Sequence, residues 1–359
     1  MTAVESSSSS GAGGRPLYKP RPSGLKRWAE PSATLALFIF LGLSAVYPLL
    51  DWTQVFPHDT DFGKGNLAFV FAYTVAAMGF NLLVGYSGQL GLAIAGLFAL
   101  GGYGTGVLFE DGVPFFAAFF IIAAVAAIIG VIFAFPAARL KGFFLAIATL
   151  AFGELIVKLI ELDDEVAGWL DTGGGTGKTL ELFRLGGGTN TRTVFWMSYG
   201  ALVFTYICFV ILSRGRLGRT LKSVRDIEIA TGPIGISSTR YKLIAFGLSA
   251  FTASMGGALF AQNATFINPG TFKTRLLVFL LVILIIGGVS RLWGPLIGAF
   301  FFVYIREKLQ DVEELRILMF GIALMLAVLM LPGGFASLPS RLRESRYIQD
   351  LRKRMRALL

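Results

Sequence analysis

The stretch Asn81–Gly106, NLLVGYSGQLGLAIAGLFALGGYGTG, is apolar enough for a membrane interior, yet glycines and polar side chains interrupt it. Glycine lowers helix propensity, so we expect the chain to leave the helix within residues 85–91. Non-helical backbone is tolerated in a bilayer only where protein buries it or where it lines a wet cavity. We therefore predict that Asn81, Ser87 and Gln89 lie at a break inside a helical membrane protein and contribute to a translocation path.

The glycines that follow in the same stretch predict a ridge of small residues, on which neighbouring helices can approach closely. They are Gly96, Gly101, Gly102, Gly104 and Gly106.

Outside this stretch the chain is equally apolar. Of 359 residues, 55% are hydrophobic and 15% are charged, whereas soluble domains carry about 25% charged residues. A membrane helix needs about 20 apolar residues. We expect an all-α polytopic membrane protein of about ten transmembrane helices, or as few as eight because 294–305 is short. The candidate spans are 33–50, 65–85, 89–109, 114–135, 142–160, 194–213, 243–262, 275–290, 294–305 and 315–331.

The distribution of charge predicts an orientation, because Lys and Arg are retained in cytoplasmic loops. With the N-terminus inside, the inner segments are 1–32, 136–141, 214–242, Arg291 and 332–359. They hold 22 of the 32 basic residues and 6 of the 22 acidic ones. Both termini are therefore predicted to be cytoplasmic. The net charge of +10 is then a topology signal, and nucleic-acid binding is not expected.

Three regions follow from this arrangement. Residues 1–32 are predicted to form a disordered basic cytoplasmic tail, and residues 33–335 a transmembrane domain whose longest outer loop is 161–193. Residues 336–359 are predicted to form a basic cytoplasmic helix on membrane lipid.

The inner segment 213–240 carries the clearest amphipathic pattern of the chain. Apolar residues at positions 217, 221, 224 and 227 repeat at helical spacing, with arginine and lysine between them. We expect a short helix lying under the membrane. It could rest on anionic lipid, or it could offer a surface to a cytoplasmic partner.

Glu154 stands inside a predicted span, where an ionised carboxylate is penalised by a few kcal/mol. Lys158 follows one helical turn later, in the favourable order for an ion pair. Three interpretations stay open: a structural pair, a substrate or gating contact, and proton coupling in a secondary transporter.

Catalytic residues, cofactors and metal ligands are not expected. The single His58 lies in a polar loop, and the single Cys208 lies in an apolar run. The segment 171–179, DTGGGTGKT, is similar to a phosphate-binding loop but has Thr172 where that motif requires glycine. A membrane-embedded enzyme is therefore not expected.

Four stretches together carry a resemblance to a known family. They are Asn81–Gly91, Arg139–Glu154, the inner segment 213–240 with the following Tyr-Lys-Leu, and Gly287–Gly298. On these residues the chain resembles the permease subunits of branched-chain amino-acid ABC importers, in their LivM-like branch, from about residue 65 to 335. The glycine-rich breaks at 85–96 and 287–298 also suggest an internal duplication.

The resemblance implies a multi-pass protein of the bacterial cytoplasmic membrane. It also implies partners: a second related permease, two cytosolic ATPase subunits and an extracytoplasmic solute-binding protein. Segment 213–240 would be the coupling loop that docks on the ATPase, with the following residues in that role: Arg219, Arg225, Glu228, Ala230 and Gly235. Two alternatives stay open, a permease for urea or short amides and an ion-coupled secondary transporter.

Overall fold

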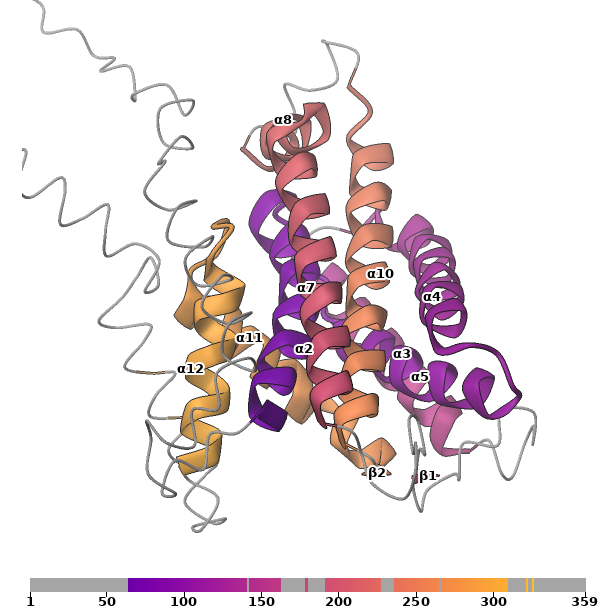
Figure 1. The fold of residues 1–359 in the computed structure, drawn as a ribbon. Helices are drawn as coiled ribbons and strands as arrows, with labels where there is room; N and C mark the ends of the chain where they lie inside the picture. The colour runs from indigo at the N-terminus through magenta and orange to yellow at the C-terminus, as the bar shows by residue number, and fades with distance from the viewer. Residues whose placement is uncertain are drawn as a thin grey trace, which may run out of the picture. The chain divides into compact units, whose positions relative to one another are not determined.

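The computed structural model describes residues 64–140, 142–162, 178–179, 191–226, 236–264, 266–308, 321 and 325. Within these residues the fold is almost entirely helical (Figure 1). In chain order its elements are α2 (Lys64–Phe80), the π-helical segment η2 (Asn81–Tyr86), α3 (Ile94–Glu110), α4 (Phe115–Ala137), α5 (Phe143–Glu161), β1 (Lys178–Thr179), α7 (Thr191–Arg214), α8 (Arg216–Asp226), α10 (Ser238–Ala264), β2 (Phe266–Ile267), the 3-10 turn η4 (Pro269–Phe272), α11 (Thr274–Gly287) and α12 (Gly294–Lys308).

The predicted spans between residues 65 and 305 coincide with helices of the structure. Among the described residues, six helices are long and apolar enough to cross a membrane, and α3 is a shorter apolar helix. The spans predicted at 33–50 and 315–331 lie outside the described residues, apart from the helical residues 321 and 325. The total of about ten crossings stays a prediction.

Helices α2, α3 and α10 form the interior of the bundle. Small residues allow their close packing: a side chain at Gly96 would collide with the backbone of α5, one at Gly101 with the backbone of α10, and one at Gly104 with Ile122 of α4. The predicted ridge of small residues is confirmed at these positions. It lets α3 lie against three neighbours at once.

Helices α4, α5 and α7 lie outside this core and expose large apolar side chains. Examples are Phe116, Ile128, Ile132, Phe135, Leu155, Leu159, Phe204 and Ile211. Soluble monomers rarely expose so many large apolar side chains next to one another. A bilayer accommodates them at no cost, because its hydrocarbon is as apolar as the side chains.

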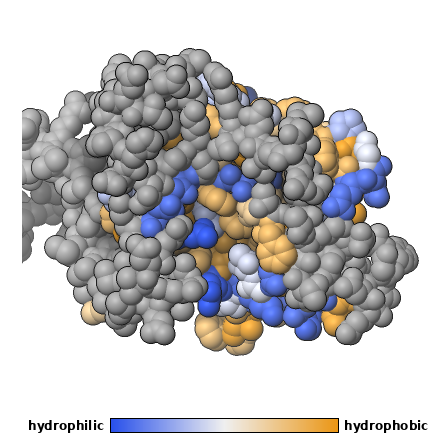
Figure 2. Space-filling view, turned by 60° about the horizontal axis from the view of Figure 1, so that its bottom comes forward, coloured by the Kyte–Doolittle hydropathy of each residue, from blue (hydrophilic) through white to orange (hydrophobic). Residues whose placement is uncertain are grey.

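The bundle has two distinguishable ends (Figure 1). Helix α8 marks one, which we call the α8 end. The antiparallel pair β1–β2, in which Lys178 lies opposite Ile267, marks the other, the β end. Figure 2 is turned so that the β end comes forward, and it shows hydrophilic residues among apolar ones. Lys178 and Thr179 thus lie in a strand, where a phosphate-binding loop would begin a helix.

Loops predicted to share one side of the membrane do meet in the structure. The outer loop 161–193 supplies β1, which pairs with residues just beyond the span 243–262. Lys273 also pairs with Glu161 at this end, with 3.4 Å between Nζ and Oε2. Helix α8 and Arg291, both predicted to be inner, lie at the opposite end.

Candidate functional site

Asn81 joins the two glycine-rich breaks of the chain. Its side chain is fully buried at the start of η2. The amide nitrogen donates to the backbone carbonyl of Arg291 at 2.7 Å, and the amide oxygen accepts from the backbone N–H of Ser290 at 2.8 Å. Both bonds satisfy backbone groups that the interruption between α11 and α12 leaves without helical partners.

Ser290 strengthens the same junction from the other side. Its φ of +66° is in the left-handed region, which lets the chain turn sharply after α11. Its hydroxyl donates to the carbonyl of Gly85 at 2.6 Å. A Cβ on Gly85 would lie 2.7 Å from the backbone nitrogen of Ser290, so this approach requires glycine.

Arg225 brings α8 into this junction. Its Nη1 donates to the carbonyl of Gly85 and, at 2.9 Å, to the hydroxyl oxygen of Ser290. Its Nη2 lies 2.9 Å from the carboxylate of Asp226. Gly88, at φ +72°, leaves room for the arginine side chain, because a Cβ there would lie 2.5 Å from Arg225 Cγ. One guanidinium therefore contacts both breaks.

A second residue of α8 lies against η2. The Nζ of Lys222 is 4.7 Å from the centre of the Tyr86 ring, a cation–π distance. Burial lowers the pKa of Lys222 to about 8, and the nearby positive charge of Arg225 acts in the same direction. Leu221 and Val224 are buried and Arg219 is exposed, which confirms the predicted amphipathic helix.

The non-helical residues after η2 have partners of their own. Gln89 donates to the hydroxyl of Ser87 at 3.0 Å and to the carbonyl of Lys242, in α10, at 3.5 Å. The hydroxyl oxygen of Thr149, in α5, accepts from the backbone N–H of Leu92 at 2.9 Å. The break is therefore tied to two further helices.

Glu154 lies elsewhere. It accepts a 2.6 Å hydrogen bond from the hydroxyl of Thr274, at the start of α11. Of the three interpretations of Glu154, the structural pair with Lys158 is wrong, because Lys158 binds Glu161 at 3.2 Å instead. Glu161 lies one turn beyond Lys158 at the helix end, where it also reaches Lys273.

The predicted site residues thus fall into two groups. Asn81, Ser87, Gln89 and Arg225 are at the α8 end, whereas Glu154 is nearer the β end. Glu228, Ala230 and Gly235 lie outside the described residues.

Two contributors, Ser290 and Thr149, were not predicted. Ser290 directly follows Gly287-Gly-Val in a stretch already singled out, and a polar residue after two glycines was the available signal. Thr149 gave no signal of its own, because hydroxyls are common in membrane helices.

A helical bundle with an apolar outer surface, and with broken helices tied to an amphipathic helix at one end, defines a multi-pass membrane protein. The sequence model of the family described as "Branched-chain amino acid transport system / permease component" matches residues 65–329, and the chain belongs to this family. It is 32% identical over 289 residues to the high-affinity branched-chain amino acid transport system permease protein LivM of Salmonella typhimurium, and equally to LivM of Escherichia coli K12.

Each alignment covers 73% of this chain and 67% of the relative. No solved structure matches the chain. The protein is therefore a multi-pass permease of branched-chain amino acid transport in the bacterial inner membrane.

Proposed function

We propose that this permease is driven from the cytoplasm, as one of two related membrane subunits of an ABC importer for branched-chain amino acids. Two cytosolic ATPase subunits would supply the energy, and an extracytoplasmic binding protein would deliver the solute. The proposal rests on the contacts of Arg225, whose guanidinium joins the surface helix α8 to both breaks.

The α8 end is then the cytoplasmic end, and both termini lie on that side. When the ATPases close, they displace α8, and Arg225 transmits the movement to Gly85 and Ser290. Since Asn81 binds the backbone of residues 290 and 291, η2 and the start of α12 move together. Two packed arrangements of this junction would open and close the path.

The polar residues predicted to line the path have different tasks in this mechanism. Asn81, Ser87 and Gln89 hold the non-helical backbone in place, and their hydrogen bonds support this role. Glu154 lies near the β end, where the binding protein would deliver an amino acid. Its carboxylate accepts from the hydroxyl of Thr274 and would hold the start of α11 in place there.

The energy source is tested with the complete importer in liposomes, by uptake of radiolabelled leucine. We expect uptake with ATP in the compartment that holds the ATPases and no uptake with a proton or sodium gradient alone. Uptake driven by a gradient without ATP would contradict the proposal and favour a secondary transporter. Competition by urea or acetamide, without competition by isoleucine or valine, would contradict the substrate assignment.

The role of Arg225 is tested against its neighbour Arg219, which is exposed on the same helix. Arg219→Ala should weaken co-purification of the ATPases. Arg225→Ala should leave co-purification intact and lower leucine uptake about 10- to 100-fold, as expected for loss of hydrogen bonds from a charged donor.

Arg225→Lys should not restore uptake, because an ammonium cannot reproduce the planar fork of the guanidinium. Normal uptake by Arg225→Ala, or loss of ATPase binding in that variant, would contradict the coupling role.

A further inference from the structure

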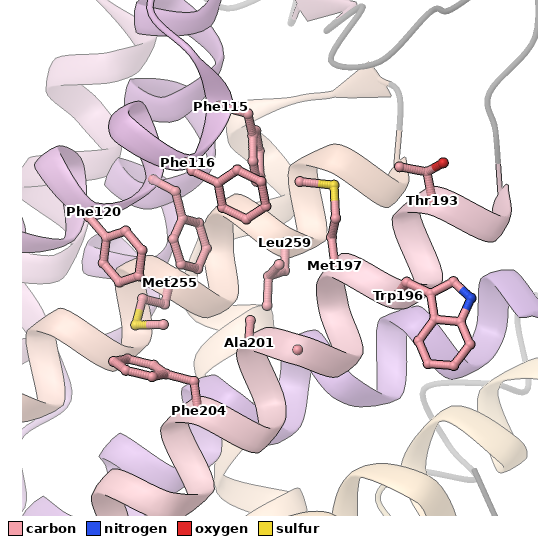
Figure 3. A pocket seen from close by; sticks show the side chains of 12 residues that line it. Phe115, Phe116, Phe120, Thr193, Trp196, Met197, Ala201, Phe204, Met255 and Leu259 are labelled. Atoms are coloured by element: carbon pink, nitrogen blue, oxygen red, sulfur yellow. The ribbon is translucent and has the colours of Figure 1, made fainter. Parts of the chain in front are cut away.

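An apolar groove runs between α4 and α7, with α10 as its floor (Figure 3). Its volume is about 590 Å³. Phe116 and Phe120 contribute from α4, Phe204 from α7, and Met255 from α10, and the side chains of Phe120, Met255 and Phe204 lie close together around the space. The groove is separate from the junction around Asn81 and Arg225.

The lining excludes the transported solute as the occupant. It is aromatic and aliphatic, with the hydroxyl of Thr193 at one edge, and no charged residue belongs to it. An amino acid would have to bury an ammonium and a carboxylate there without partners, which is strongly unfavourable. The lining instead suits a hydrocarbon.

The groove has the length of one leaflet. It follows α7 from Thr193 to Phe204, a rise of eleven steps from one residue to the next, which at 1.5 Å each is about 16 Å. The hydrocarbon core of a bilayer is about 30 Å thick, so the groove reaches about half way. At its deeper end Phe120 and Phe204 close it with an edge-to-face ring contact, 5.9 Å between centroids.

We propose that this groove binds one acyl chain of a phospholipid from the leaflet at the β end. Phe116, Phe120 and Phe204 are 61%, 43% and 46% exposed, so the chain can enter sideways from the bilayer. A transmembrane helix of a second permease would have to continue over the full ~30 Å, beyond the point where the two rings meet. The proposal depends on the membrane setting and not on the energy source or the solute.

Gly200 is the position where the groove can be filled without disturbing the helix. A Cβ built there meets nothing within 4 Å, so a larger side chain would extend into open space. Glycine is also the poorest non-proline helix former, so replacing it does not weaken α7.

The test uses the full-length protein in nanodiscs with phosphatidylcholine that carries a photoactivatable diazirine in one acyl chain. After irradiation, mass spectrometry should place the attached lipid at residues 115–120 and 193–204, in preference to the exposed face of α5. Gly200→Phe should reduce this attachment at least about five-fold, because the ring occupies the space of the chain.

Ala151→Phe is the matched control, since Ala151 is exposed on α5 outside the groove. It should leave the attachment unchanged. If Gly200→Phe does not fold, Ala201→Leu narrows the groove more gently and replaces it.

Uniform labelling of all lipid-facing helices would overturn the proposal, as would attachment that Gly200→Phe does not reduce. Disulfide formation between Gly200→Cys and another permease subunit would assign the groove to a partner and would also overturn it.

Discussion

Helix packing is incomplete both at the α8 end and at the groove between α4 and α7. Hydrogen bonds fill the gap at the first place, and apolar side chains line an open space at the second. At the α8 end, hydrogen bonds join segments about 210 residues apart. In the groove, aromatic rings line a space that a side chain at Gly200 could enter freely. Directional bonds specify one arrangement of a polar junction, whereas non-directional apolar contacts tolerate an exchangeable occupant.

The largest effect on stability should come from Asn81→Ala. This change removes both hydrogen bonds that the Asn81 side chain makes in the part-buried junction, to the backbone N–H of Ser290 and to the carbonyl of Arg291. At about 1–3 kcal/mol for each of the two bonds, the free energy of unfolding should fall by about 2–6 kcal/mol. Denaturant unfolding in bicelles measures it.

The control for Asn81→Ala is Asn268→Ala, which removes an exposed cap of η4 near the β end. It should cost about 1 kcal/mol or less. If both variants lowered the free energy of unfolding equally, the junction around Asn81 would be no more important for stability than the rest of the bundle.

Substitution of one glycine in each region should change the free energy of unfolding in opposite directions. Gly85→Ala forces a methyl group to within 2.7 Å of the Ser290 nitrogen, and overpacking of this kind costs about 1–3 kcal/mol. Gly200→Ala meets nothing within 4 Å and should stabilise α7 by about 0.5–1 kcal/mol. The same unfolding measurement serves both. If Gly85→Ala proved neutral, the close approach of the two breaks would be wrong.

Glu154→Gln should have a smaller effect. The amide oxygen of glutamine can still accept the hydrogen bond from Thr274, so ATP-driven leucine uptake should stay within about two-fold of the original. Complete loss of uptake at normal expression would show that the negative charge itself is required. Thr274→Val, which removes the donor and keeps the charge, is the matched control.

The smallest expected effect concerns Lys222. Its pKa in the folded protein is about 8, below the ordinary 10.5, so the unfolded state binds more protons between these values. The free energy of unfolding should therefore rise as the pH increases from about 8 towards 10.5. Denaturant midpoints at pH 7.5 and 9.5 measure the change. Lys222→Met should reduce the rise and Lys242→Met should preserve it; equal rises in both variants would contradict the burial of Lys222.

Much of the fold was predictable from local sequence. The eight spans predicted between residues 65 and 305 coincide with helices, six of them long and apolar enough to cross a membrane, and the amphipathic helix lies where it was predicted. Hydropathy sums over a window and helical periodicity repeats within it, so both are readable locally. The family followed from four short stretches. The partner of Glu154 was not predictable in this way. Its carboxylate accepts a hydrogen bond from Thr274, 120 residues away, and not from Lys158, one helical turn further along α5.

Sequence alone therefore determined that this chain is a bundle of membrane helices with a glycine-rich break near residue 85 and a basic helix after residue 213. Only the tertiary structure decided that Arg225 turns inward to that break, that Ser290 meets it from the opposite half of the chain, and that α4 and α7 leave a groove. The physical reason is the distance along the chain over which each property is decided. Transfer to a membrane depends on summed composition, whereas a hydrogen bond depends on positions within a few tenths of an ångström, which packing of distant segments sets.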